Sequence, residues 1–318
     1  MRFALSTSQQ NTTWERLLPV WRELDDIDVF ESGWVFDHFY PIFSDPTGPC
    51  LEGWMVMAAL AQATKRVRVG NLVTGMVYRH PTILANMAAT LDITSGGRLE
   101  LGLGAAWNEE EIDAYGLELG TLTQRFDRFE EGLQVIIGML TQETTTFSGR
   151  YYDVTDARCN PKPVQQPHPP ICIGGSGERR TIPIAARYAQ HLNLGVPDVE
   201  TFKHKREVLE QRCADIGRDP AEVTLSVLSS TATRGWTRSR WRTGSRPTTR
   251  SAAAWPSSRS RATIRSGSSL WPTRCARSAD GQPGARPASW SSSSSFSRPA
   301  LAARAVASVA ARSTTAAT

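Results

Sequence analysis

Residues 81–111 read PTILANMAATLDITSGGRLELGLGAAWNEEE, and this stretch decides the fold class. It predicts a helix over residues 80–94 that has Pro81 in its first turn and ends before Gly96 and Gly97. Residues 99–103 form a short apolar run of the length and composition of a buried strand. Asn108 and three glutamates then predict the start of another helix. The predicted strand, the polar loop after it and the helix that follows together make up one βα unit.

The same alternation runs along most of the chain. A parallel sheet covered by helices follows from it, because parallel strands need crossover connections. No dinucleotide fingerprint follows the first predicted strand, so a TIM (β/α)8 barrel is favoured over a doubly wound sheet. The eighth βα unit is due after Leu228, where the pattern stops, and the barrel is predicted to be incomplete there. Strands are predicted at residues 3–5, 34–36, 67–73, 99–103, 170–173, 191–194 and 223–228, and helices at 14–24, 55–63, 80–94, 125–140, 181–189 and 199–216.

The segment 234–318 differs from the rest of the chain in composition. It contains 15 Arg, no Lys and one acid, Asp280, so its net charge is +14. Residues 1–233 contain 21 Lys and Arg against 30 Asp and Glu, which gives −9. Two domains are therefore predicted, a barrel over 1–233 and a disordered tail over 234–318. The basic pI of the whole chain describes neither of them.

Three interpretations of this tail compete. A basic arm for nucleic acid is disfavoured, because the segment has no Lys and its five Trp have no repeating spacing. An ordinary disordered extension is usually poorer in aromatic residues. A shifted reading frame in a GC-rich gene accounts for the excess of Arg and the loss of acids, and we favour it. No nucleic-acid partner is therefore expected.

Cysteines and hydropathy indicate a cytoplasmic protein. The five Cys have no CxxC spacing, which favours reduced thiols and predicts no metal site. The first residues lack the pattern of a signal peptide. No apolar run approaches the roughly 20 residues that a membrane helix needs.

In such barrels the chemistry lies at the carboxyl ends of the strands. This rule selects Asp37 and His38 after the second predicted strand, Thr74 and Gly75 after the third, and residues 104–108 after the fourth. His38 could act as an acid, a base or a hydrogen-bond donor. The alternative for Asp37 and His38 is a structural pair that caps the strand end.

A glycine-rich turn follows the fifth predicted strand. Gly174, Gly175, Ser176 and Gly177 precede a helix, and the backbone N–H groups of such a turn form an anion site, with Arg179 beside it. The alternative is a plain tight turn. Two further groups are expected to be structural: His80 as a helix-start residue, and Glu109, Glu110 and Glu111 as a solvated first helical turn, with Asn108 as its N-cap.

Four stretches together resemble the luciferase-like monooxygenase superfamily, specifically its coenzyme F420-dependent oxidoreductase branch. The resemblance covers residues 1–230. The stretches are SGGRLELGLGAAWNEEE at 95–111 followed by AYG at 114–116, HP at 80–81 with ATLD at 89–92, RFDRFEE at 125–131, and NPKP at 160–163 leading to PPICIGGSGERRT at 169–181.

This resemblance implies a TIM barrel that binds F420, or alternatively FMN, at the mouth formed by the carboxyl ends of its strands. It implies hydride transfer between the cofactor and a small organic substrate, with Asp37 and His38 near the ring and Asn108 in contact with the cofactor. It also implies that Gly174, Gly175, Ser176, Gly177 and Arg179 hold the cofactor phosphate. Relatives often form homodimers, and a homodimer is possible here.

Two positions refine what the resemblance implies. A non-prolyl cis peptide often follows the third strand in this superfamily, and we expect it at Thr74–Gly75 or Gly75–Met76. Relatives that oxidise sugar phosphates carry an acid in the loop after the fourth strand, where this chain has Ala105 and Ala106. A glucose-6-phosphate activity is therefore not expected. A reduced-FMN monooxygenase of the same superfamily and a defunct product are the alternative functions.

Overall fold

The structure is a computed structural model that describes residues 3–42 and 44–228. The predicted tail, its domain boundary at residue 233 and the reading-frame hypothesis lie outside the described residues. The strands are β1 (Phe3–Ser6), β2 (Phe30–Val35), β3 (Arg68–Asn71), β4 (Thr74–Gly75), β5 (Leu99–Gly104), β6 (Thr145–Ser148), β7 (Asp153–Ala157), β8 (Ile171–Gly174), β9 (His191–Leu194) and β10 (Thr224–Val227). The helices are α1 (Trp14–Asp25), α2 (Gly53–Ala63), α3 (Pro81–Thr94), α4 (Glu109–Ala114), α5 (Leu122–Thr141), α6 (Thr181–Tyr188), α7 (Val199–Asp215) and the 3-10 turn η1 (Pro220–Glu222).

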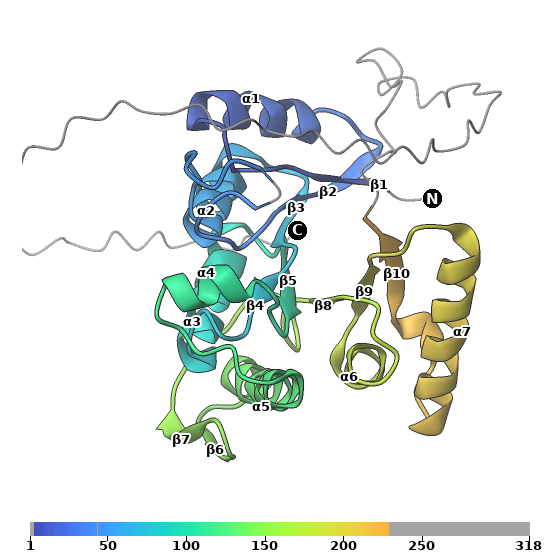
Figure 1. Cartoon of the computed structure of the whole chain (residues 1–318). Helices are drawn as coiled ribbons and strands as arrows, with labels where there is room; N and C mark the ends of the chain where they lie inside the picture. Colours follow the sequence, from blue (N-terminus) through green and yellow to red (C-terminus); the bar gives the residue numbers. More distant parts are fainter. Residues whose placement is uncertain (1–2, 43, 229–318) are drawn as a thin grey trace, which may run out of the picture. The chain divides into compact units, whose positions relative to one another are not determined.

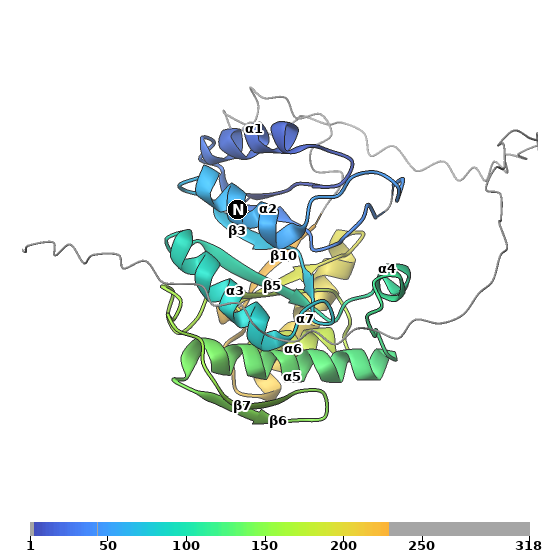
Figure 2. The same ribbon diagram turned by 90° about the vertical axis from the view of Figure 1, so that its left-hand side faces the viewer.

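The main sheet is parallel and follows the order β1-β2-β3-β5-β8-β9-β10, with β4 pairing with β5. Helices lie outside this row of strands: α1 and α2 near β1 to β3, α6 and α7 beside β9 and β10 (Figures 1 and 2). The curled parallel sheet confirms the TIM-barrel prediction. Within residues 3–42 and 44–228, β1 and β10 are the outer strands and do not pair with each other, as expected for a barrel that lacks its eighth unit.

Most predicted elements match the observed ones. The largest shift is in β2, which begins four residues before the predicted residue 34. The antiparallel hairpin β6–β7 was not predicted, because its strands carry few apolar residues. This hairpin follows α5 and leaves the order of the parallel sheet unchanged.

Strand β5 shows why the barrel wall forms. Its residues Leu99, Leu101 and Leu103 are fully buried, and α3 packs against the strand. Alternate residues of a strand point to opposite faces, so Glu100 and Gly102 face the inside of the curled sheet. A Cβ atom at Gly102 would lie 1.7 Å from the carbonyl oxygen of Asn71 in β3, so only glycine fits there.

A polar layer fills the inside of the sheet near the amino ends of the strands. His191 contacts Glu100 through Nδ1 (3.2 Å) and Ser226 through Nε2 (2.6 Å), while Arg68 donates from Nε to Glu100 (2.8 Å). Burial alone would raise the pKa of Glu100. The hydrogen bond and charge of His191 and the charge of Arg68 outweigh it and leave the pKa below its ordinary value.

The four cysteines of the described part, Cys50, Cys159, Cys172 and Cys213, are free thiols. Burial raises the pKa of the Cys50 thiol to about 11. Among residues 3–42 and 44–228, no helix has the length and apolar content to cross a membrane.

Replacing Gly102 tests the contact between β3 and β5. We expect Gly102→Ala to lower the free energy of unfolding by about 3 kcal/mol or more, since the new methyl group collides with the backbone of Asn71. Gly195→Ala is the matched control, because a Cβ at Gly195 meets nothing within 4 Å. Urea denaturation of both variants measures the difference, and equal stabilities would contradict the account.

Replacing Glu100 tests the polar layer. A carboxylate with a lowered pKa stabilises the folded state above its unfolded pKa, and that contribution is lost as the pH falls through the folded pKa. Glu100→Gln should therefore be less stable than wild type near pH 7, and the difference should shrink as the pH drops below about 4.5. Thermal denaturation across this pH range measures it. A difference that does not depend on pH would show that Glu100 acts only through packing.

Candidate active site

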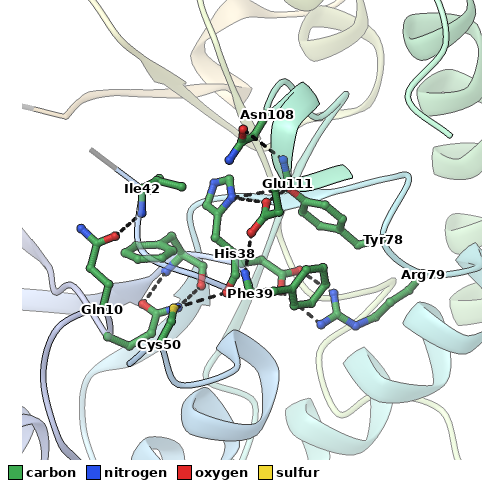
Figure 3. Close-up of polar contacts among 12 residues, drawn as sticks. Gln10, His38, Phe39, Ile42, Cys50, Tyr78, Arg79, Asn108 and Glu111 are labelled. Atoms are coloured by element: carbon green, nitrogen blue, oxygen red, sulfur yellow. Dashed lines mark hydrogen bonds and ion pairs between the residues drawn. The ribbon is translucent and has the colours of Figure 1, made fainter. Parts of the chain in front are cut away.

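His38 lies just beyond the carboxyl end of β2 and is 6% exposed. Its Nδ1 atom lies 2.6 Å from Oε2 of Glu111 (Figure 3). Glu111 belongs to α4, which follows the loop after β5. The structure thus joins the ends of two barrel strands through one imidazole–carboxylate contact.

Glu111 is fully buried, and its carboxylate accepts from three donors. Besides the contact with His38, Oε1 accepts from the backbone N–H of Phe39 (2.6 Å) and Oε2 accepts from the hydroxyl of Tyr78 (2.7 Å). Burial raises the pKa of Glu111, but the three donors outweigh burial and hold its pKa below the ordinary value. Glu111 is therefore a buried carboxylate that keeps its charge.

This finding corrects one expectation. The sequence predicted that Glu109, Glu110 and Glu111 form a solvated helical turn. Glu109 and Glu110 are indeed exposed, but Glu111 points inward. Asn108 is the N-cap of α4 as expected, and its side chain accepts from the backbone N–H of Glu111 (3.5 Å).

Aromatic side chains surround the imidazole of His38. Tyr78 and Trp107 meet it edge to face at centroid distances of 6.2 and 5.6 Å, and Phe36 lies 5.5 Å away. Burial and the bond to Glu111 raise the pKa of Tyr78 far above its ordinary value, so its hydroxyl remains a donor. Trp107 is 53% exposed, which leaves an apolar surface at the mouth beside His38.

Asp37 points into a different network from His38. It is fully buried and pairs with both terminal nitrogens of Arg79 (2.6 and 3.1 Å), which also contacts Glu52. Burial raises the pKa of Asp37, and the charge of Arg79 opposes that shift. A side-chain hydrogen bond joins Asp37 to Thr74, whose hydroxyl also accepts from Nε1 of Trp54 (2.9 Å). Asp37 and Thr74 are both fully buried and belong to one polar network.

The non-prolyl cis peptide lies at Leu72–Val73, not at Thr74–Gly75 or Gly75–Met76 as expected. The expectation was wrong by two or three bonds, because β3 ends at Asn71 and the chain bulges before it pairs again with β5 as β4. Val73 stands within this bulge between β5 and β8. A Cβ atom would lie 2.7 Å from a Val73 methyl at Gly104 and 2.9 Å from one at Gly174, so both positions exclude a side chain.

The glycine-rich turn lies after β8, and the helix that follows it begins at Thr181 as the sequence predicted. Gly174 ends the strand, and a turn at residues 178–180 separates the glycines from α6. Gly175 donates its N–H to the carbonyl of Asn193. The N–H groups of residues 176–179 donate to no acceptor within the described part of the chain, and Arg179 is exposed without an ion pair there.

Sequence reasoning missed Glu111, Tyr78 and Arg79. The spacing of Asn108 and Glu111 is that of a helix N-cap and its third residue, a signal that such a side chain can turn back toward the chain. Tyr78 and Arg79 lie three and four residues after the end of β4, so the strand-end rule would have selected this loop had the bulge been predicted.

The residues at the mouth fit a flavin or deazaflavin with a phosphate tail. Free N–H groups at residues 176–179 and the cation of Arg179 match the donors that a phosphate requires. Half-buried Val73, flanked by glycines, offers an apolar support of the kind a flat ring needs. His38 and Trp107 lie on the loops that close the same mouth.

A family comparison agrees with this geometry. The family model described as "Luciferase-like monooxygenase" matches residues 1–274, which extends beyond the composition boundary at 233. An F420-dependent glucose-6-phosphate dehydrogenase of Amycolatopsis mediterranei is 34% identical over 161 residues, 50% of this chain and 46% of that protein. Pyrimidine monooxygenase RutA of Klebsiella pneumoniae is 28% identical over 223 residues, 69% of this chain and 60% of that protein. The chain thus spans about half to three fifths of these curated relatives.

Solved structures show the same fold. An F420-dependent secondary alcohol dehydrogenase, solved with an F420–acetone adduct, has a TM-score of 0.65 and 25% identity, covering 71% of this chain and 68% of its own. The monooxygenase RslO1 from Streptomyces bottropensis has a TM-score of 0.62 and 21% identity, covering 71% and 70%.

Replacing Arg79 tests the buried ion pair. Arg79→Met leaves the carboxylate of Asp37 buried without its partner, and we expect the free energy of unfolding to fall by about 3–5 kcal/mol. Arg16→Met, at an exposed arginine, should change it by less than about 0.5 kcal/mol. Asp37→Asn combined with Arg79→Met should recover part of the loss. Chemical denaturation measures all three, and an undiminished stability of Arg79→Met would contradict the pairing.

Proposed function

The chain belongs to the luciferase-like monooxygenase family, and from this premise we propose that it is an oxidoreductase that uses coenzyme F420. Hydride would pass between the cofactor and a small organic substrate at the barrel mouth. The observation that carries the proposal is His38, whose imidazole lies at the end of β2 against a buried carboxylate and beside the exposed ring of Trp107. Members of the family are oxidoreductases or monooxygenases by name, and relatives named for F420 occur among both sequences and structures.

The residues proposed to hold the cofactor come from four loops. Gly174, Gly175, Ser176 and Gly177 would surround its phosphate through backbone N–H groups, with Arg179 supplying a charge. Thr74, Gly75 and Asn108 would lie beside the ring system, where Thr74 and Gly75 continue the bulge that carries Val73. When bound, the deazaflavin supplies the hydride chemistry, and the protein supplies orientation and hydrogen bonds.

His38 is proposed to move a proton on the substrate. The His38 side chain is almost fully buried, so a substrate hydroxyl or carbonyl placed beside it would be desolvated. The aromatic surroundings favour a small, uncharged organic substrate over a sugar phosphate, and Ala105 and Ala106 add no charge to the loop. Asp37 would act indirectly, by fixing the chain that leads to His38.

A reduced-FMN monooxygenase is the second candidate. It is supported by relatives named monooxygenase that match this chain over similar lengths, including pyrimidine monooxygenase RutA. A third possibility is a product without activity, because β1 and β10 are unpaired with each other in the described part of the chain and exposed strand edges promote misassembly. The proposed partners are a small-molecule substrate and a second copy of the chain, not nucleic acid.

Binding titrations separate these candidates. We expect saturable binding of F420 by the full chain and weaker binding of FMN, measured by the fluorescence of each cofactor. Tight binding of reduced FMN alone would favour the monooxygenase, and binding of neither would favour the inactive product. DNA binding that weakens steeply with salt would instead support a basic arm beyond residue 233.

His38→Ala tests the proposed acid or base. Turnover with F420 and an active alcohol or ketone should fall about 100-fold or more, while F420 affinity changes little. His168→Ala, whose imidazole contacts the backbone near the opposite end of β8, is the control and should keep wild-type turnover. Wild-type turnover in His38→Ala would remove the assignment.

A further inference from the structure

The carboxylate of Glu111 can only accept hydrogen bonds while it is ionised. Of its three partners, the backbone N–H of Phe39 is a donor that cannot reverse its role. The hydroxyl of Tyr78 and the imidazole of His38 can each act as donor or acceptor. The Tyr78 hydroxyl and the His38 imidazole must therefore both donate a hydrogen bond to the carboxylate.

This requirement decides where the proton of His38 lies. With Nδ1 at 2.6 Å from Oε2 of Glu111, the neutral imidazole must carry its hydrogen on Nδ1. Its Nε2 then holds a free lone pair. Contacts with Phe36, Tyr78 and Trp107 surround the ring and restrict its rotation.

We propose that Glu111 is a positioning residue that holds His38 in the Nδ1–H tautomer and so makes Nε2 the atom that exchanges a proton with the substrate. The inference rests on the proposed function for its catalytic consequence, but the tautomer itself requires neither cofactor nor substrate. In the oxidative direction, Nε2 would take the hydroxyl proton. The substrate carbon that bears this hydroxyl would lose hydride to the cofactor proposed above, and its C–O bond would become C=O. In the reductive direction, a doubly protonated His38 returns that proton to the oxygen.

A single substitution inverts this arrangement. In Glu111→Gln, one carboxylate oxygen becomes an NH2 group of nearly the same size. The fixed N–H of Phe39 requires the remaining amide oxygen to face it, which turns the NH2 group toward His38 and Tyr78. Nδ1 must then accept a hydrogen bond, and the proton moves to Nε2.

Nitrogen NMR of the cofactor-free protein, labelled with 15N-histidine, measures the tautomer directly. Wild-type His38, assigned by its loss in His38→Ala, should show the Nδ1–H form when neutral, and Glu111→Gln should show the Nε2–H form. A wild-type protein with the Nε2–H form, or with the two tautomers averaged, overturns the proposal. Because the wild-type spectrum alone decides this point, the test does not depend on a variant that might not fold.

Kinetics supply the second readout. In Glu111→Gln, kcat should fall about 100-fold or more with little change in KM, since Nε2 has lost its lone pair. Tyr78→Phe removes a donor but leaves the carboxylate, so it should keep the Nδ1–H form. Glu110→Gln, at the exposed neighbouring position, should leave the tautomer and kcat unchanged.

The two claims can fail separately. If the Nδ1–H form is found but neither F420 nor FMN supports turnover, the proposed function fails and the positioning role stands. If turnover is found and the tautomer is Nε2–H, the positioning role fails alone. A drop in stability of Glu111→Gln without a change of tautomer would assign Glu111 a purely structural role and overturn the proposal.

Discussion

A buried, ionised carboxylate is the constraint on which the site depends. Glu111 is removed from water in full, and an unpaired charge there would cost several kcal/mol. Its three donors come from the segment after β2 and from the segment after β4, while Glu111 itself follows β5. Satisfying one carboxylate therefore fixes three loops at the carboxyl ends of neighbouring strands. The geometry around His38 follows from that requirement.

The second constraint is close backbone approach between strands. Gly102 admits the carbonyl of Asn71, while Gly104 and Gly174 admit the methyl groups of Val73. These contacts allow the chain to form a bulge after β3 and then to pair with β5 again as β4. The bulge places Val73 at the mouth and leads the chain to Tyr78 and Arg79. Interior packing and the polar site are thus linked through the same short segment.

The sequence predicted the elements better than the side-chain partners. Apolar runs such as residues 99–103 predicted the strands, because the burial of a strand face is visible in the local pattern of apolar residues. The strand-end rule found His38 and Asn108 for the same reason. Glu111 was missed because three adjacent glutamates look alike in sequence, and only the fold decides which one turns inward. The position of the cis peptide was missed because it depends on where β3 leaves β5, a property of two distant segments.

Asp37 and His38 are neighbours in sequence but belong to separate hydrogen-bond networks. Asp37 is fully buried and pairs with Arg79, whereas His38 contacts Glu111. The three hydrogen-bond donors around Glu111 require that it carry a negative charge at neutral pH despite its burial. Infrared difference spectroscopy between the wild-type protein and Glu111→Gln tests this claim most directly. We predict that the wild type shows an ionised carboxylate band that the variant lacks, and a protonated carboxylic acid band in its place would contradict the account.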